Sequence, residues 1–382
     1  MSVIREKIIY LANIRLPTEK AHGIQVAKMC EALAEQGLEV ELMAPNRLNS
    51  IKDDVFNYYG IKKNFILNKL PCIDLISRAA WLGRIAYWVE ALSFAWSVKK
   101  HLKDFSGSIY TRELGNIAFL GPNNRITYEA HNLPKRPNAL YRHWLKKINN
   151  LAVITRGLKD DFIALGFSAE RILVAPDAVD LKVFSISDSK IYCRKRLNLP
   201  LNRRIVLYAG HLYDWKGADT LLGAAKLLPE CLLIFVGGTN VDVANFRKKA
   251  QSNQAENGLI VGHRPAGEIP AYLCAADVLV LPNSAKSTIS ARYTSPLKLF
   301  EYMASRRPII ASDLPSLREI LTEEIAIFFK PDDSQSLAEG IKSSFDNPAV
   351  AAKKAETAYL KAQNYTWDKR AEEIINFLKI VN

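Results

Sequence analysis

The sequence lacks the features that mark several protein classes. Its five cysteines form no Cys-x-x-Cys pair and no cluster with histidine, so we expect neither a disulfide framework nor a zinc site. No apolar run reaches the roughly 18 residues of a membrane-spanning helix, and a predicted strand begins at Lys7, so we expect no signal peptide. The motifs Gly-x-Gly-x-x-Gly and Asp-x-Asp are absent, which leaves no support for a bound dinucleotide and no obvious ligand pair for a metal ion. We therefore expect a cytoplasmic protein without bound metal or cofactor.

The order of apolar segments indicates two α/β domains. A length of 382 residues with 49% hydrophobic content is enough for two cores. Short apolar runs alternate with helical periods along the chain, as in parallel α/β sheets. A polar, basic stretch at 185–203 separates two such series. We predict two Rossmann-like domains with parallel sheets facing across a cleft: residues 1–184, to which 366–382 return, and residues 185–365.

Positive charge is in excess and unevenly spread. The formal net charge is +13, and residues 51–150 hold sixteen Lys and Arg against seven Asp and Glu. This bias favours an anionic partner, such as a nucleotide diphosphate or an anionic membrane. A helix predicted over 76–103 carries Trp81, Trp88 and Trp96 beside basic residues. Such a helix suits peripheral contact with a membrane, or equally a place against the core.

The segment from Tyr293 to Glu319 is the most informative part of the chain. We predict that Ser295 caps a helix whose first residue is Pro296. Lys298 and Glu301, three residues apart, then project the same way. A helix start can hold an anion, and an outward-facing glutamate can accept hydrogen bonds from ribose hydroxyls. The alternative is a surface helix with a solvated ion pair.

This segment resembles a known family. S-P-L-K-L-F-E-Y-M-A at 295–304 and P-I-I-A-S-D at 308–313 are similar to the nucleotide-sugar signature of the retaining glycosyltransferases of GT-B architecture, glycosyltransferase group 1. The resemblance implies transfer of a sugar, with retention, from a nucleotide-diphosphate donor to a glycan or lipid-linked acceptor. It also implies a role in cell-surface polysaccharide synthesis, a nucleotide-sugar site in the C-terminal domain and no requirement for a metal.

The resemblance also implies roles for individual residues. Those expected to contact the donor sugar or the leaving diphosphate are His131, Lys216 and His211. Those expected to bind the nucleotide sugar are Glu301, Lys298, Ser295, Leu297, Gly262, His263 and Gly23. The chain departs from the family where a second glutamate is usual, because that position is Tyr293, and at His211, where the family has arginine.

Two alternatives stay open at this point. A non-hydrolysing nucleotide-sugar epimerase has a similar architecture and needs acid and base carboxylates, for which Glu129 and Glu113 are the candidates. A basic nucleic-acid-binding or scaffold protein would fit the charge, although the chain carries no recognisable nucleic-acid motif.

Overall fold

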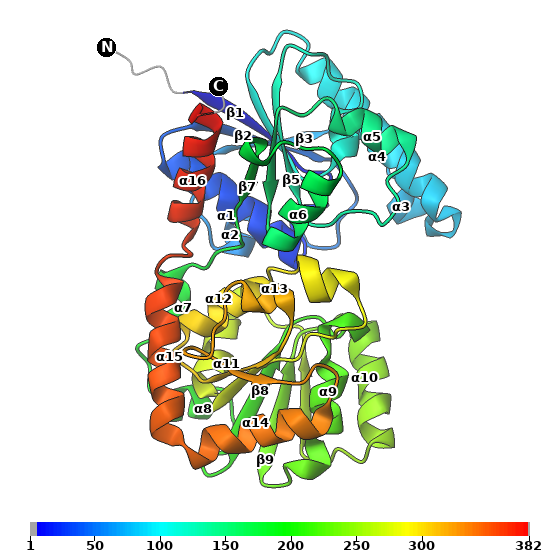
Figure 1. The fold of residues 1–382 in the computed structure, drawn as a ribbon. Coiled ribbons are helices and arrows are strands. Elements are labelled where there is room, and N and C mark those ends of the chain that lie inside the picture. The colour runs from blue at the N-terminus through cyan, green and yellow to red at the C-terminus, as the bar shows by residue number, and fades with distance from the viewer. Residues whose placement is uncertain (1–5, 381–382) are drawn as a thin grey trace. The chain divides into compact units, whose positions relative to one another are not determined.

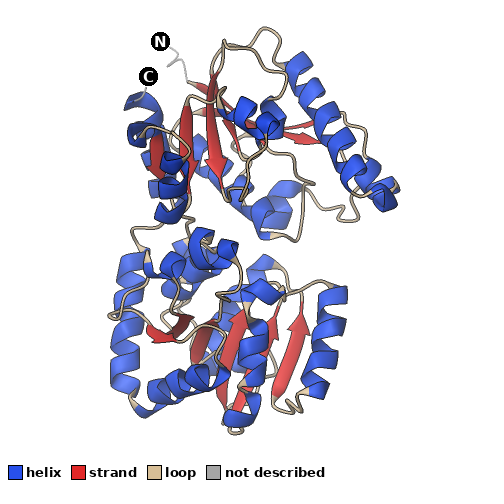
Figure 2. Cartoon of the chain, turned by 45° about the vertical axis from the view of Figure 1, so that its right-hand side comes forward, coloured by secondary structure: helices blue, strands red, loops and turns tan. Residues whose placement is uncertain are grey.

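The computed structural model describes residues 6–380 and contains two compact units. The first unit extends to Pro176 and resumes at Trp367, and the second spans Asp177–Thr366. The chain leaves the first unit earlier than the predicted 184 and re-enters it next to the predicted 366. Figure 1 follows the chain through both units, and Figure 2 shows the strands of each lying side by side with helices packed around them.

The first unit is built on a seven-stranded sheet with the order β3-β2-β1-β4-β5-β6-β7. Every strand pair is parallel, and the central register places Tyr10 beside Tyr110. The inner strands are almost wholly apolar because helices cover both faces of such a sheet. The strands are β1 (Lys7–Leu11), β2 (Glu39–Pro45), β3 (Ile66–Leu70), β4 (Ser108–Thr111), β5 (Arg125–Ala130), β6 (Asn150–Val153) and β7 (Ile172–Val174).

The helices of the first unit include the last helix of the chain, α16, which packs against α1. They are α1 (Ala21–Glu35), α2 (Val55–Tyr59), α3 (Leu75–Arg78), α4 (Arg84–His101), α5 (Ala139–Leu145), α6 (Arg156–Ala164) and α16 (Trp367–Ile380). The single helix predicted over 76–103 is wrong. Gly83 has φ +49° and ψ −115°, which no helix accommodates, so α3 and α4 are separate.

The second unit repeats the plan with a six-stranded parallel sheet of order β10-β9-β8-β11-β12-β13. Its strands are β8 (Arg204–Ala209), β9 (Cys231–Val236), β10 (Gly258–Gly262), β11 (Val278–Leu281), β12 (Ile309–Ser312) and β13 (Ile327–Phe329). Its helices are α7 (Leu181–Phe184), α8 (Lys190–Arg196), α9 (Ala218–Gly223), α10 (Asn240–Ser252), α11 (Ile269–Ala275), α12 (Leu297–Ala304), α13 (Pro315–Arg318), α14 (Ser334–Asp346) and α15 (Pro348–Ala362).

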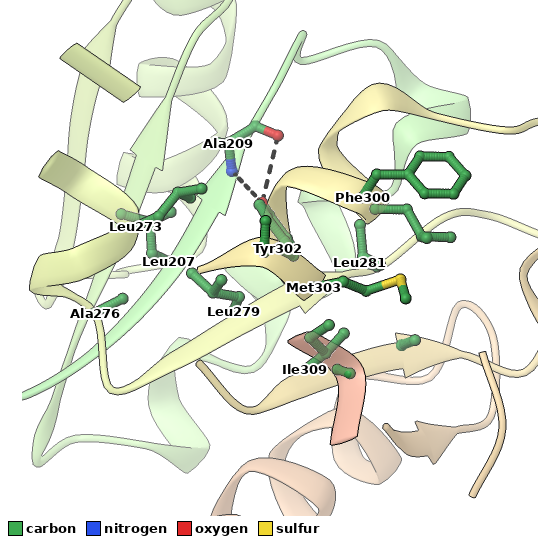
Figure 3. Packing of buried hydrophobic residues seen from close by; sticks show 14 of the residues in the cluster. Leu207, Ala209, Leu273, Ala276, Leu279, Leu281, Phe300, Tyr302, Met303 and Ile309 are labelled. Atoms are coloured by element: carbon green, nitrogen blue, oxygen red, sulfur yellow. Dashed lines mark hydrogen bonds between the residues drawn. The ribbon is translucent and has the colours of Figure 1, made fainter. Parts of the chain in front are cut away.

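Helix α12 is anchored on the core of the second unit, as Figure 3 shows. Phe300, Tyr302 and Met303 are fully buried. The hydroxyl of Tyr302 accepts a hydrogen bond from the backbone N–H of Ala209 at 2.7 Å and lies 3.5 Å from the carbonyl oxygen of Ala209, to which it donates. Since Ala209 ends β8, this side chain fastens α12 to the point where the loop after β8 begins.

In each sheet the strand order reverses once. The reversal lies between β1 and β4 in the first unit and between β8 and β11 in the second. Open parallel sheets bind ligands at the carboxyl ends of the strands on either side of such a reversal. The loops after β8 and β11, and those after β1 and β4, are therefore where sites are expected. Among residues 6–380, no helix is both long and apolar enough to cross a membrane.

Candidate functional site

The loop after β8 is a tight turn with stacked aromatic side chains. The ring of His211 stacks on Tyr213 with the ring centroids 5.0 Å apart, and Tyr213 stacks on Trp215 at 6.4 Å. Lys216, half-buried, places its ammonium 4.1 Å from the centroid of the Trp215 ring. The aromatic face holds the cation in place without supplying a counter-charge.

A glycine at the end of this turn allows the turn to pack directly against the loop after β11. Gly217 has φ +72°, and a Cβ there would lie 1.6 Å from the carbonyl oxygen of Pro282. The N–H of Ser284 also donates to the carbonyl of Trp215 at 3.1 Å. The turns on the two sides of the strand reversal are therefore in direct contact, and the backbone around Lys216 is fixed.

Helix α12 contributes Lys298 and Glu301. Lys298 is 8% exposed, its ammonium lies 4.0 Å from the centroid of the Tyr208 ring, and no described residue accepts a hydrogen bond from it. Ser295 is not the N-cap. Pro296, extended at φ −78° and ψ 134°, precedes the helix, while the hydroxyl of Ser295 accepts from the N–H of Asp177 at 3.0 Å. The predicted cap is wrong because the serine hydroxyl is used in this long-range contact.

Electrostatic coupling shows that these side chains form one cluster. Burial lowers the pKa of Lys216 to about 8, against the attraction of Asp177. Burial, reinforced by Lys216, keeps the pKa of Lys298 well below its usual range, although Glu301 opposes the shift. Burial raises the pKa of Glu301 to about 7, where Lys298 opposes the shift and Asp177 adds to it. Buried amines and carboxyls with such shifts are typical of sites that bind charged or polar ligands.

The remaining candidates of the second unit lie around this cluster or at the end of β10. Leu297 is the first residue of α12 and is partly exposed. Gly262 ends β10 with φ +81°, and its carbonyl accepts from the N–H of Gly237. His263, next in the chain, is exposed. These positions are compatible with contacts to the base of a bound nucleotide, and their roles stay predictions.

In the first unit, His131 follows β5 and belongs to a buried polar network. Its Nε2 lies 2.6 Å from the carboxylate of Glu129, and its side chain is 22% exposed. Gly23 lies in the first turn of α1, where a Cβ would lie 2.1 Å from the hydroxyl of Tyr59. Gly23 is therefore helical, and its close packing against Tyr59 is a structural reason for a glycine at this position.

Several residues of these clusters were not predicted from the sequence. Asp177 is joined to Ser295 across 118 positions of the chain, and no local pattern marks such a contact. Trp215 and Tyr208 act through their ring faces, which any aromatic residue of a turn or strand could offer. The one available signal was the strand reversal itself, which directs attention to the loops after β8 and β11.

Comparisons with known proteins match the second unit to a protein family. Residues 190–363 match the family model described as "Glycosyl transferases group 1". TuaC of Bacillus subtilis (strain 168), named as a teichuronic acid biosynthesis glycosyltransferase, is 31% identical over 171 residues, which are 44% of this chain and 40% of TuaC. WcaI of Escherichia coli (strain K12), named for colanic acid biosynthesis, is 24% identical over 54% of this chain and 52% of WcaI. The chain thus matches about half the length of these relatives.

Solved structures match over nearly the whole chain. Sucrose-phosphate synthase from Thermosynechococcus elongatus aligns with a TM-score of 0.79 and 19% identity over 99% of both chains. The Anabaena protein HepE, solved in complex with UDP-glucose, aligns with a TM-score of 0.75 and 17% identity over 98% of this chain and 99% of HepE. The prediction of two Rossmann-like domains in the GT-B architecture is confirmed, and the match to the glycosyltransferase group 1 model lies within the second unit.

Proposed function

We propose, from the glycosyltransferase group 1 domain at residues 190–363, that the chain transfers a sugar from a nucleotide-diphosphate donor. The acceptor is a glycan or a lipid-linked glycan, and the product contributes to a cell-surface polysaccharide. The names of TuaC and WcaI, which refer to teichuronic and colanic acid biosynthesis, support this substrate class. In this proposal the second unit binds the donor and the first unit binds the acceptor.

One observation carries the proposal: two lysines share a site in which neither has a full counter-charge. Lys298 is buried without a hydrogen-bond partner in the described chain, and its pKa is depressed further by Lys216. A buried amine without a counter-charge is stabilised in its charged form by a ligand that brings negative charge. Glu301, one helical turn away, supplies an acceptor for hydroxyl groups. An anion joined to a hydroxyl-bearing group, as in a nucleoside diphosphate, satisfies both.

The proposed reaction follows from where charge develops. When the bond between the sugar and the diphosphate breaks, negative charge grows on the leaving phosphate. Fixed cations that meet this charge lower the barrier because they need not reorganise. Lys216 and Lys298 have this role in the proposal, which requires no metal. We further propose retention at the anomeric carbon, with the acceptor attacking from the face that the diphosphate leaves.

The two alternatives are not favoured. An epimerase would need carboxyl groups ready to exchange protons, and Glu129 is instead held by Arg370, Tyr110 and His131. A nucleic-acid-binding or scaffold protein offers no reason for two lysines with lowered pKa values beside a glutamate with a raised pKa.

The test is a thermal-shift screen followed by a transfer assay. Uridine, guanosine, adenosine and thymidine diphosphates and their sugar conjugates are added to the purified chain. A ligand that binds only the folded protein raises the melting temperature by mass action. Sugar donors that stabilise the protein are then incubated with and without glycan acceptors. Turnover that needs no acceptor would support the epimerase, and stabilisation by DNA alone would support the nucleic-acid protein.

Donor affinity should depend on pH in a narrow range. Lys216 has a lowered pKa, so its charge is present below about pH 8 and is lost above it. Glu301 has a raised pKa, so it is ionised only above about pH 7. We expect the affinity for a nucleoside diphosphate to be greatest between these values and to fall on both sides. Calorimetry from pH 6 to 9 measures this profile. Lys216→Arg should weaken the alkaline decline without abolishing it, because Lys298, whose pKa is also lowered, still loses its charge as the pH rises. An unchanged profile in that variant contradicts the assignment.

We also propose peripheral contact between the first unit and an anionic membrane. Trp81, in the short 3₁₀ turn that precedes α4, is 84% exposed, and Ile85, in the first turn of α4, is 63% exposed. Farther along the same helix, Trp96 is 46% exposed with the ammonium groups of Lys99 and Lys100 at 5.0 and 5.9 Å from its ring. Exposed aromatic side chains beside lysines suit the boundary between headgroups and acyl chains.

Vesicle flotation tests this contact. We expect the protein to float with phosphatidylserine vesicles at about 20 mM salt and to be released at about 500 mM, because screening weakens its attraction to the anionic surface. Trp81→Ser combined with Trp96→Ser should reduce binding, whereas Leu360→Ser, at an exposed leucine of the second unit, should not. Failure to float at low salt would mean that the acceptor is reached without this surface.

A further inference from the structure

Glu129 is the centre of a polar network inside the first unit. It is fully buried next to the last residue of β5. One carboxylate oxygen accepts from the side-chain amide of Gln25 at 2.8 Å and lies 2.6 Å from Nε2 of His131. The other accepts from the hydroxyl of Tyr110 at 2.5 Å and pairs with the guanidinium of Arg370 at 3.1 Å. Both oxygens thus have two partners each.

The network keeps Glu129 ionised. Burial by itself would raise the pKa of this carboxyl, but Arg370, His131 and Arg112 outweigh it and hold the pKa well below its usual range. Arg370 is 3% exposed and reaches Glu129 from α16, near the end of the chain. Its guanidinium also donates to the carbonyl of Ala175 at 3.2 Å. A carboxylate paired in this way is rigid as well as charged.

The orientation of each partner is fixed by a second contact. Gln25 presents its amide N–H to Glu129 because its amide oxygen accepts from Arg112 at 2.6 Å. With that oxygen of Glu129 ionised, the imidazole of His131 must place an N–H at Nε2, since two acceptors would repel each other. The hydrogen bond to one ring nitrogen therefore sets the tautomer of the whole ring.

We propose that Glu129 is a positioning residue, which fixes the orientation of His131 and places the proton of its ring on Nε2. The proposal rests on the proposed function, in which His131 contacts the sugar-bearing substrate. Because His131 is 22% exposed while Glu129 is fully buried, the histidine can touch a ligand and the glutamate acts only through it. Arg370 extends the arrangement to α16, so the last helix of the chain supports the site.

The first measurement needs no substrate. Nitrogen NMR of the wild-type imidazoles separates the two tautomers, and we expect His131 to carry its proton on Nε2. A wild-type His131 protonated on Nδ1 alone would overturn the proposal without any variant. In Glu129→Gln, which keeps the shape and removes the charge, we expect the signal to move to a mixture of tautomers. An unchanged signal in this variant also overturns it.

The second measurement links position to activity. Glu129→Gln should lower kcat/KM by roughly 10–100-fold, the range found for outer partners of metal-binding histidines. In a His131→Ala background, Glu129→Gln should lower kcat/KM by less than about threefold, because the imidazole that Glu129 positions is absent. Equal losses in both backgrounds would show a merely structural role. If the tautomer shifts as expected and no donor supports transfer, the proposed function fails while the positioning role stands.

A matched control is available in the same unit. Glu41 on β2 is 6% exposed, pairs with Lys7 at 2.9 Å and lies 3.2 Å from Nε2 of His101. Glu41→Gln therefore removes a buried, histidine-paired carboxylate of the same kind from a different network. It should leave the signals of His131 and kcat/KM unchanged. Melting temperatures of both variants separate a general loss of stability from a change at His131.

Discussion

Lys216→Ala is expected to lower kcat and kcat/KM together, by roughly 10²–10³-fold, the scale seen when one donor to a developing negative charge is removed. Lys216 is held above the ring of Trp215, and the backbone on its C-terminal side is fixed because Gly217 lies against Pro282. Steady-state kinetics with a saturating acceptor measure the effect.

The control for this substitution is another lysine of the same unit. Lys226 is exposed and donates to the side chain of Gln254, away from the loops after β8 and β11. Lys226→Ala removes one positive charge from the second unit and should leave kcat near the wild-type value. A Lys216→Ala enzyme with normal kcat would mean that the turn after β8 does not meet the leaving group.

Glu301→Ala should weaken the binding of a nucleoside diphosphate by about 1–3 kcal/mol, because ribose hydroxyls lose their buried acceptor. This corresponds to roughly 5–150-fold in affinity. Inorganic pyrophosphate has no ribose, so its affinity should not fall in this variant. Lys216→Ala should instead weaken the binding of both the nucleoside diphosphate and pyrophosphate. Calorimetry with the two ligands and the two variants thus separates the ribose contact from the phosphate contact.

Two outcomes would contradict this division. If Glu301→Ala binds the nucleoside diphosphate as tightly as wild type, Glu301 is not in the site. If the affinity of this variant for pyrophosphate falls as well, the substitution has disturbed Lys298, which neighbours Glu301 on α12. The assignment of Glu301 to the ribose then has no support. Glu301→Gln distinguishes charge from hydrogen bonding, because the amide oxygen still accepts. It should retain part of the affinity and lose the decline below about pH 7.

Patterns that depend on neighbours in sequence allowed correct predictions. The alternation of short apolar runs with helical periods indicated parallel sheets, and strands such as β8 and β11 are runs of this kind because buried parallel strands are apolar on both faces. The spacing of Lys298 and Glu301 placed both on one side of a helix, and the structure couples them electrostatically. These predictions needed only the geometry of a single element.

Predictions that depend on distant partners failed or could not be made. Ser-Pro is typical of a helix start, yet Ser295 is used by Asp177 and the helix begins after Pro296. The helix predicted over 76–103 failed for a local reason instead, because Gly83 lies within it and has backbone angles that end any helix. Gln25 and Glu129 are 104 positions apart, and no sequence pattern in either segment predicts their contact. Such contacts come from the packing of whole elements, which a single sequence does not display.

The hydroxyl of Tyr302 has a consequence for how sites of this kind can diversify. It ties α12 to Ala209, where the turn that carries Lys216 begins. A buried hydrogen bond therefore fixes the spacing between α12 and the turn that carries Lys216. Residues on the outward side of α12 can then be exchanged during evolution, or in a library, without moving the lysine of the turn. Under the proposed function, recognition of the donor can then change while Lys216, which we propose to meet the leaving phosphate, is inherited intact.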